Sequence, residues 1–287
     1  MTKVLIFGAN GMLGRALLKH LESTEFEVLA TTRTGINGTL IFDAEMHHPE
    51  TALESLEPGD FVLNAIGLIS HLIDEENTRD RLQAIAVNAV FPLNLARDAE
   101  ERGLKVIQIG TDCVFDGRSG SYTEDDLHNA TDVYGKTKSL GESESQAVML
   151  LRSSIVGPEQ GKNLSLFEWV RSQDSNASIE GYLDHYWNGV TTDAFSQVVL
   201  GILRSNLFTS GVHHLVPSTI VTKSELVRSI ADKCGRTDIQ VREVETERKI
   251  DRTLETLHPD LNSRLWAAAG FNKIPSVQQL IQEISIN

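Results

Sequence analysis

The sequence predicts an α/β protein with a doubly wound parallel sheet and a smaller C-terminal α/β lobe. Short apolar segments alternate with helical patterns through the first half of the chain, as strands and crossover helices do. A glycine-rich turn follows the first apolar segment, and the alternation breaks after Pro158. We expect one domain over residues 1–158 and a second lobe over residues 159–287 that covers the ligand edge of the sheet. The helix near residues 192–204 is expected to return to the first domain.

Composition excludes several classes of protein. The 287 residues are 40% hydrophobic and 23% charged, which is typical of a globular chain. The formal net charge of -14 opposes nucleic-acid binding through the phosphates. No apolar run is long enough to cross a bilayer and no signal-peptide pattern opens the chain, so no membrane partner is expected. Two cysteines, Cys113 and Cys234, favour neither a disulfide framework nor a zinc site, which fits a reducing cytoplasm.

The first strand and helix enclose a turn that is typical of dinucleotide binding. Residues 3–7 form an apolar strand, and a helical pattern resumes over residues 15–21. Glycines between them let a pyrophosphate approach the backbone, and the helix N-terminus supplies amides and a positive dipole end. This predicts a Rossmann-type sheet whose cofactor contacts include Gly8, Asn10, Gly11, Met12, Leu13 and Gly14. A tight turn without a ligand is the alternative.

The end of the second strand, residues 26–32, bears on the choice of cofactor. An acidic residue at this tip would bind the ribose 2'-hydroxyl, whereas an arginine accommodates a 2'-phosphate. The tip carries Thr32 and Arg33 and no acid. We therefore predict NADP(H) in preference to NAD(H), with a solvated surface arginine as the alternative.

The third and fourth strands supply further candidate contacts at their ends. Residues 40–43 form a short strand that closes with Asp43, which we expect near the adenine edge. The strand at residues 61–66 ends in small residues that would let the middle of the cofactor pass closely: Ala65, Ile66 and Gly67. Plain strand-end chemistry is the alternative for both sites.

A long helical pattern runs from Thr78 to Arg102, and Gly103 ends it in the usual way. Pro92 is expected to kink this helix. Asn88 lies inside it, and a buried asparagine needs polar partners. The neighbouring strand end and the helix that follows could supply them, so Asn88 is a candidate cofactor-site residue.

The strongest motif combines a strand tip with a helix. The apolar strand at residues 104–109 ends before Thr111, and Tyr134-Gly-Lys-Thr-Lys138 follows a turn-rich loop. Residues four apart on a helix share a face, so the phenol of Tyr134 and the ammonium of Lys138 are expected side by side. A fixed cation favours the phenolate and lowers its pKa, which suits a proton donor to an oxygen that becomes an alkoxide. The Thr111 hydroxyl could hold the same oxygen. An exposed helix with one tyrosine and one lysine is the alternative.

The chain after the sixth strand, residues 148–151, has a looser pattern. Expected elements are helices at 164–171, 194–203, 224–233 and 278–284 and strands at 212–216 and 239–244. Trp187 and Asn188 could stack on and bond a nucleobase, with core packing as an equal alternative. The pairs His47-His48 and His213-His214 do not predict a metal site, because neighbours on a strand point to opposite faces.

Taken together, these motifs resemble the extended short-chain dehydrogenases, and among them the dTDP-4-dehydrorhamnose reductase group. The resemblance is specific up to about Pro158 and looser beyond. It rests on Gly8-x-x-Gly-x-x-Gly14, Thr111-Asp-x-Val-Phe-Asp-Gly117 and Tyr134-Gly-Lys-x-Lys138-x-x-Gly-Glu142. Arg152 with its serines and Arg252 in Asp-Arg-Thr-Leu-Glu-Thr also match.

The resemblance implies a mechanism and a substrate site. The nicotinamide would pass a hydride to the 4-keto carbon of a nucleotide-linked deoxysugar. Tyr134 would donate the proton, Lys138 would hold the cofactor ribose, and Thr111 would orient the sugar oxygen. Further substrate contacts are implied for Asp112, Cys113, Ser154, Ile155 and Arg252. The group usually has tyrosine in place of Cys113 and tryptophan in place of Ile155, so the sugar and the base stay open.

Three other functions remain as alternatives. A nucleotide-sugar epimerase on the same scaffold more often has a Ser-Ser-x-x-Val-Tyr pattern, and a 4,6-dehydratase needs a glutamate where Cys113 stands. A binding or regulatory subunit without turnover would not need Thr111, Tyr134 and Lys138. The partner expected is a nucleotide-sugar substrate, and a homodimer is possible.

Overall fold

The computed structural model describes residues 1–35, 38–160 and 164–286, and the chain forms two compact units. Unit 1 comprises Met1–Asp116, Leu127–Arg152 and Ile202–His213. Unit 2 comprises Gly117–Asp126, Ser153–Gly201 and His214–Asn287. The chain passes repeatedly from one unit to the other, and helix α7 (Thr192–Ser205) begins in unit 2 and ends in unit 1.

Unit 1 is built on a seven-stranded sheet with the order β11-β6-β5-β4-β1-β2-β3. Every pairing from β6 across to β3 is parallel, which confirms the predicted parallel sheet. The strands are β1 (Lys3–Phe7), β2 (Glu27–Thr32), β3 (Leu40–Ile41), β4 (Phe61–Asn64), β5 (Lys105–Ile109), β6 (Val148–Arg152) and β11 (Gly211–His214). The strand order reverses at β1, between β2 and β4. In such sheets a ligand binds at the carboxyl ends of the strands, where the order reverses.

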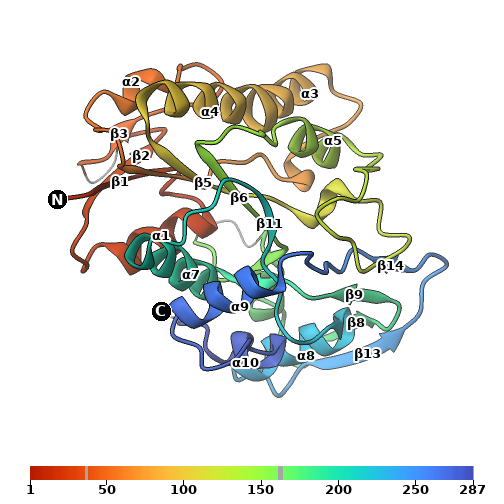
Figure 1. Ribbon diagram of the computed structural model, residues 1–287. Coiled ribbons are helices and arrows are strands. Elements are labelled where there is room, and N and C mark those ends of the chain that lie inside the picture. The colour runs from red at the N-terminus through yellow and green to blue at the C-terminus, as the bar shows by residue number, and fades with distance from the viewer. Residues whose placement is uncertain (36–37, 161–163, 287) are drawn as a thin grey trace. The chain divides into compact units, whose positions relative to one another are not determined.

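Helices cover this sheet. They are α1 (Met12–Leu21), α2 (Glu50–Leu53), α3 (Thr78–Ile85), α4 (Phe91–Arg102) and α5 (Val133–Leu140). Figure 1 shows α3, α4 and α5 together on one side of the strands. Phe7 of β1, Phe42 and Phe91 of α4 are buried together, with ring centroids 4.7 to 5.4 Å apart. Burying these rings fixes α4 on the sheet, because aromatic side chains remove a large apolar area from water.

The long helical pattern of residues 78–102 contains a π-helical turn. Ala86–Val90 forms this turn, η3, between α3 and α4, and its flanking residues keep right-handed helical torsions. Pro92 lies in the first turn of α4, where the missing N–H costs little. The expected kink at Pro92 is therefore replaced by a widened turn at Asn88, and such turns are frequent at functional sites.

Unit 2 consists of short strands packed against helices. Its strands are β7 (Ile155–Val156), β8 (Ser178–Tyr182), β9 (His185–Trp187), β10 (Val190–Thr191), β12 (Val221–Thr222), β13 (Gln240–Val244) and β14 (Ile250–Asp251). Its helices are α6 (Leu166–Arg171), α8 (Lys223–Lys233), α9 (Pro259–Ala268), α10 (Val277–Gln282) and most of α7. The strands pair as β7–β10, β8–β13 and β12–β9–β14. Phe167, Leu226 and Ile281 lie in its buried core.

Most elements expected after residue 158 are present within a few residues of their predicted bounds, including the α/β character of this part. The third strand of unit 1 is shorter than predicted, and Asp43 follows it outside the strand. The expected strand at 212–216 is β11, at the edge of the large sheet. Within the described ranges, no helix combines the length and the apolar character that a bilayer crossing requires.

Candidate cofactor and catalytic site

The glycine turn connects β1 to α1 and leads to a helix N-terminus without a side-chain cap. Gly8 adopts a φ of 83°, a left-handed conformation that favours glycine. Its N–H donates to the Thr31 hydroxyl at 3.3 Å, and the Gly11 N–H donates to the Gly8 carbonyl at 3.0 Å. Gly11 is the N-cap of α1 and makes no side-chain cap, so the first amides of the helix can serve an anion.

Gly14 allows β1 and α1 to approach closely. A Cβ at this position would lie 2.1 Å from the Gly8 carbonyl oxygen. By contrast, a Cβ on Gly11 would meet its nearest atom at 3.4 Å. The turn therefore has the shape of a cradle that a side chain would fill, and this fits a dinucleotide pyrophosphate. Asn10, Met12 and Leu13 occupy the rest of this turn and the start of α1.

The two residues at the tip of β2, Thr32 and Arg33, differ in their exposure to solvent. Thr32 is buried, and its hydroxyl bonds the Thr39 hydroxyl at 2.8 Å and accepts from the Gly35 N–H at 2.9 Å. Arg33 is exposed, and its guanidinium makes no hydrogen bond or ion pair within the part of the chain that the structure describes. An Oδ atom of Asp43 accepts from the Glu45 N–H at 2.9 Å and so shapes the turn after β3.

The segment after β4 lies against the glycine turn. The Ala65 N–H donates to the Phe7 carbonyl at 3.1 Å, and Ile66 Cγ1 lies 2.9 Å from the point where a Cβ on Gly8 would stand. The ends of β1 and β4 are thereby joined where the strand order reverses. Gly67 continues this segment toward Asn88.

Asn88 holds the segment after β4 in place. Its Oδ1 accepts from the Leu68 N–H at 2.8 Å, and its Nδ2 donates to the Leu68 carbonyl at 2.9 Å and to the Thr137 hydroxyl at 3.2 Å. The residue is 2% exposed, and both amide hydrogens are used. Its predicted polar partners are confirmed as a strand-end segment and α5. These contacts give Asn88 a positioning role, and its direct contact with a cofactor stays a prediction.

The structure brings Thr111, Tyr134 and Lys138 together at the carboxyl end of β5. Thr111 lies close enough to the Tyr134 phenol to act on its pKa. Lys138 Nζ donates to the carbonyl of Ile109, the last residue of β5, at 3.2 Å. Asp132 caps α5 by accepting from the Gly135 N–H at 2.8 Å, which fixes where the helix begins.

Burial dominates the charge states of this group. Burial raises the pKa of Tyr134 above its ordinary value, and Cys113 adds to this, while the hydrogen bond from Thr111 opposes it. Burial likewise lowers the pKa of Lys138, against the attraction of Glu142 and then of Cys113. The predicted lowering of the phenol pKa by Lys138 is therefore wrong for the protein itself. Tyr134 is a phenol that keeps its proton until a stronger base arrives.

Asp112 and Cys113 form the turn that follows Thr111. Asp112 is 9% exposed, and one of its oxygens receives the Thr111 hydroxyl at 3.4 Å and the Cys113 thiol at 3.8 Å. A Cβ on Gly135 would lie 2.2 Å from the Cys113 carbonyl oxygen. This close approach seats α5 directly on the turn.

The other predicted substrate contacts belong to unit 2. Trp187 is buried in the core, and its indole N–H donates to the Ser154 hydroxyl at 2.8 Å. The Asn188 amide bonds both the carbonyl and the N–H of Leu254, at 2.7 and 3.0 Å. Both side chains are buried and bonded within unit 2, as the packing alternative expects, and their contact with a nucleobase stays a prediction.

Two further predicted residues complete this set in unit 2. Ile155 begins β7 and pairs with Val190 of β10. Arg252 packs its side chain against Gly117, where a Cβ would lie 3.0 Å from Arg252 Cγ. Their substrate contacts stay predictions.

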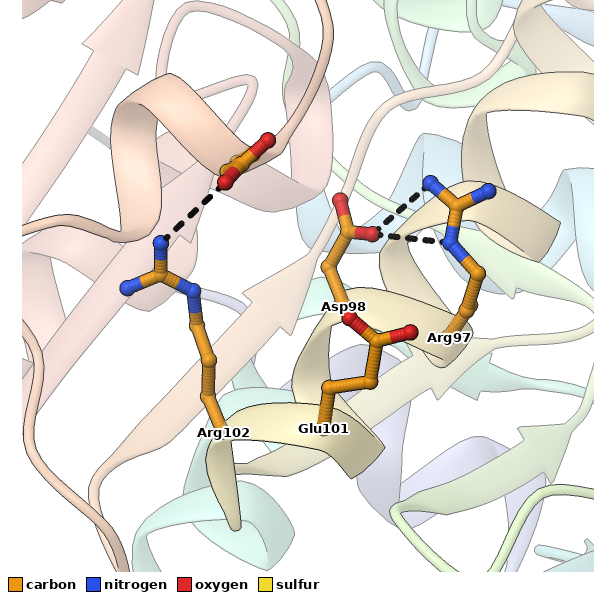
Figure 2. Close-up of a pocket in the computed structure, with 5 residues that line it drawn as sticks. Arg97, Asp98, Glu101 and Arg102 are labelled. Atoms are coloured by element: carbon orange, nitrogen blue, oxygen red, sulfur yellow. Dashed lines mark hydrogen bonds and ion pairs between the residues drawn. The ribbon is translucent and has the colours of Figure 1, made fainter.

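A surface hollow of about 290 Å³ lies away from these residues, between α2 and α4. Figure 2 shows Arg97, Asp98, Glu101 and Arg102 around it. Arg97 donates twice to Asp98, at 3.0 and 2.9 Å, and Arg102 pairs with Glu50 at 3.7 Å. Its walls are charged and largely paired among themselves, whereas small-molecule sites are mostly apolar. None of the predicted site residues lines this hollow.

Sequence reasoning missed a buried cluster beside Lys138. Arg152 and Glu142 form an ion pair at 2.6 Å, and Arg152 Nη2 lies 2.9 Å from His128 Nε2. The spacing of four residues between Lys138 and Glu142 is the signal that could have found it. An arginine can only donate, so His128 accepts at Nε2, and its Nδ1–H donates to the Ser139 hydroxyl at 2.7 Å.

The neutral state of His128 makes stability depend on pH. Burial lowers the pKa of His128 from the ordinary 6.5, and Arg152 adds to this against Glu142. The folded protein therefore binds this proton less readily than the unfolded chain, and the contribution to stability is complete above the ordinary pKa. We expect the free energy of unfolding to fall as the pH drops below about 6.5. Denaturant titrations of the wild type and His128→Gln should differ in that acidic range, and parallel pH profiles would contradict the assignment.

Comparisons with known proteins agree with this geometry. A dTDP-4-dehydrorhamnose reductase of Aggregatibacter actinomycetemcomitans is 26% identical over 245 residues, covering 81% of this chain and 79% of the relative. The methionine adenosyltransferase 2 subunit beta of Rattus norvegicus is 32% identical over 247 residues, covering 80% of this chain and 71% of the relative.

Among solved structures, a dTDP-4-dehydrorhamnose reductase of Bacillus anthracis in complex with NADP has the same fold. Its TM-score is 0.78 at 19% identity, and the match covers 99% of this chain and 98% of that one. A family model described as the RmlD substrate binding domain matches residues 1–286. The chain therefore belongs to the RmlD substrate-binding domain family.

Proposed function

We propose that this protein is an NADPH-dependent reductase of a nucleotide-linked 4-keto-deoxysugar, similar to the dTDP-4-dehydrorhamnose reductases. The observation that carries the proposal is the meeting of Thr111, Tyr134 and Lys138 at the end of β5. The glycine turn beside β4 supports it, because a dinucleotide requires that turn at that place. Family membership supports the oxidoreductase class.

The bound nicotinamide supplies the hydride, and the chain supplies binding, orientation and the proton. Tyr134 gives the proton of its phenol to the sugar oxygen. The Thr111 hydroxyl, at the end of β5, orients the same oxygen. Lys138 presents an ammonium that binds the cofactor ribose. Burial keeps the Tyr134 phenol protonated by raising its pKa, and an alkoxide forming beside it is a base strong enough to take that proton.

A single assay tests the proposed function. The purified protein is mixed with NADPH and a panel of dTDP- and UDP-linked 4-keto sugars, and cofactor absorbance is followed. Steady oxidation of NADPH with one of these sugars is the expected result. Formation of an epimer without net oxidation would favour an epimerase.

A regulatory subunit is the second candidate, and the relative that favours it is the methionine adenosyltransferase subunit at 32% identity. NADPH binding without turnover of any sugar would favour this candidate. The placement of Thr111 beside Tyr134 and of Lys138 at the end of β5 supports turnover instead.

We further propose NADP(H) in preference to NAD(H), on the basis of Arg33. Its exposed guanidinium at the tip of β2 can bind a 2'-phosphate. Because a hydrogen bond to a charged group contributes about 1.5–3 kcal/mol, Arg33→Ala should raise the KM for NADPH roughly 10- to 100-fold. The KM for NADH should stay the same, and so should both constants in Arg81→Ala, an exposed arginine of α3. A wild type that prefers NADH would contradict the assignment.

Recognition of the sugar nucleotide by unit 2, including Ser154, Ile155 and Arg252, belongs to the same proposal. Asp112 and Cys113 are the proposed contacts from unit 1. A homodimer also stays a prediction, and light scattering of the purified protein tests it.

A further inference from the structure

We propose that Glu142, held by Arg152, is a positioning residue that keeps the Lys138 ammonium charged and in place at the end of β5. The inference rests on the proposed function, in which Lys138 binds the cofactor. It concerns a buried ion pair that forms no part of the Thr111–Tyr134–Lys138 group itself.

Arg152 and Glu142 form a bidentate ion pair. Arg152 Nη2 lies 2.6 Å from Glu142 Oε2, and Arg152 Nε lies 3.3 Å from Glu142 Oε1. The Arg152 side chain is 1% exposed and that of Glu142 is 10% exposed. Two nearly parallel N–H···O bonds fix the carboxylate in orientation as well as in distance. A buried charge pair is costly to desolvate, so its presence here calls for a role beyond stability.

The pair joins the elements that carry the site. Glu142 follows α5 and lies one helical turn after Lys138, whereas Arg152 ends β6. A Cβ on Gly110 would lie 3.0 Å from Arg152 Cα, so the end of β6 touches the residue that precedes Thr111. The ion pair therefore ties the C-terminus of α5 to the strand ends on which the site is built.

Neighbouring side chains shield the Glu142–Arg152 pair from water. The Arg152 guanidinium carbon lies 5.3 Å from the centroid of the Phe115 ring, and the His128 ring meets Phe115 edge-on at 5.6 Å. His128 accepts from Arg152 at 2.9 Å. This enclosure weakens screening by water, so the Glu142 carboxylate can act on Lys138 over a longer distance, against the opposing charge of Arg152.

Glu142, which follows α5, and to a smaller extent Cys113, in the turn after β5, favour the charged form of Lys138, and the Ile109 carbonyl accepts from its Nζ. Asp112 and Asp132 act on the neighbouring Tyr134. Burial lowers the pKa of Lys138, and the Glu142 carboxylate is the larger of the two influences that oppose this shift. Without that carboxylate, Lys138 should lose its proton at a lower pH.

The test compares NADPH dissociation constants across the neutral to alkaline range, measured by fluorescence, in the wild type and Glu142→Gln. The expected result is that NADPH affinity declines at a lower pH in the variant than in the wild type. Where turnover is measured, kcat/KM should fall by up to about 10²-fold, because a shifted ammonium misplaces the cofactor. Glu168→Gln is the matched control: Glu168 is 1% exposed and paired with Arg171 at 2.6 Å in unit 2, and its loss should leave the pH midpoint unchanged.

A second variant covers the case in which Glu142→Gln does not fold. Replacing the pair together, by Glu142→Leu with Arg152→Met, removes the carboxylate without leaving a buried charge unpaired. The same shift to lower pH is expected. An unchanged midpoint in a folded variant overturns the inference, even if the wild type is an active reductase. If the wild type reduces no sugar, but the variants lose NADPH affinity at a lower pH than the wild type does, the proposed function is overturned and the inference holds.

Discussion

Tyr134→Phe is expected to lower kcat by roughly 10²–10⁴-fold, which is the usual contribution of a positioned general acid. The substitution removes one oxygen and leaves the ring, so α5 and its cap at Asp132 should keep their structure. NADPH affinity should stay close to that of the wild type, because Lys138 and the glycine turn are untouched. Stopped-flow measurement of NADPH oxidation together with fluorescence titration of NADPH separates the two effects.

Tyr182→Phe is the matched control for this experiment. Its hydroxyl donates to an exposed carboxylate, Glu180, at 3.4 Å in unit 2. Loss of that hydroxyl should leave kcat near the wild-type value. Wild-type turnover by Tyr134→Phe would contradict the proposed role of Tyr134 as the proton donor.

The parts of the site that could be predicted are those that depend on local sequence. A glycine turn between a strand and a helix has one geometry, and Gly8 and Gly14 show the torsion and close approach that the pattern requires. Tyr134 and Lys138 share a helix face because of their spacing alone. These features need no knowledge of distant contacts, so the sequence could predict them.

The parts that could not be predicted depend on which distant groups meet. The amide of Asn88 is hydrogen-bonded to the backbone of Leu68, twenty residues earlier in the chain, and the amide of Asn188 is hydrogen-bonded to Leu254. Periodicity shows that such residues are buried but not what they bond. The two-residue strands of unit 2, such as β7, are too short to show an alternation.

The direction of the pKa shift of Tyr134 differs from the prediction for a related reason. The sequence places a cation four residues away, but burial acts on the phenol more strongly than any single charge. How deeply a helix is set against its neighbours follows from packing, here the close approach of Gly135 to the Cys113 carbonyl. Only the folded structure reveals whether burial or a nearby charge has the larger effect on the pKa of the phenol.

Alanine substitutions at two glycines of the glycine turn are expected to have large effects on NADPH binding and, at one of them, on stability. Gly14→Ala would place a methyl group 2.1 Å from the Gly8 carbonyl oxygen, so β1 and α1 must separate. We expect a loss of about 1–3 kcal/mol in the free energy of unfolding, as for overpacked sites, and no measurable NADPH binding. Chemical denaturation without cofactor and fluorescence titration with NADPH measure the two quantities.

Gly11→Ala separates folding from binding at the same turn. Gly11 has a φ of -74°, which alanine adopts readily, and its Cβ would meet nothing nearer than 3.4 Å. The variant should therefore unfold like the wild type in the absence of cofactor. Its NADPH affinity should nevertheless fall, because the methyl group stands at the start of α1, where the pyrophosphate must approach the amides. If Gly11→Ala binds NADPH as tightly as the wild type, the dinucleotide does not lie on this turn; if Gly14→Ala is as stable as the wild type, the close approach of β1 and α1 is not what requires a glycine there.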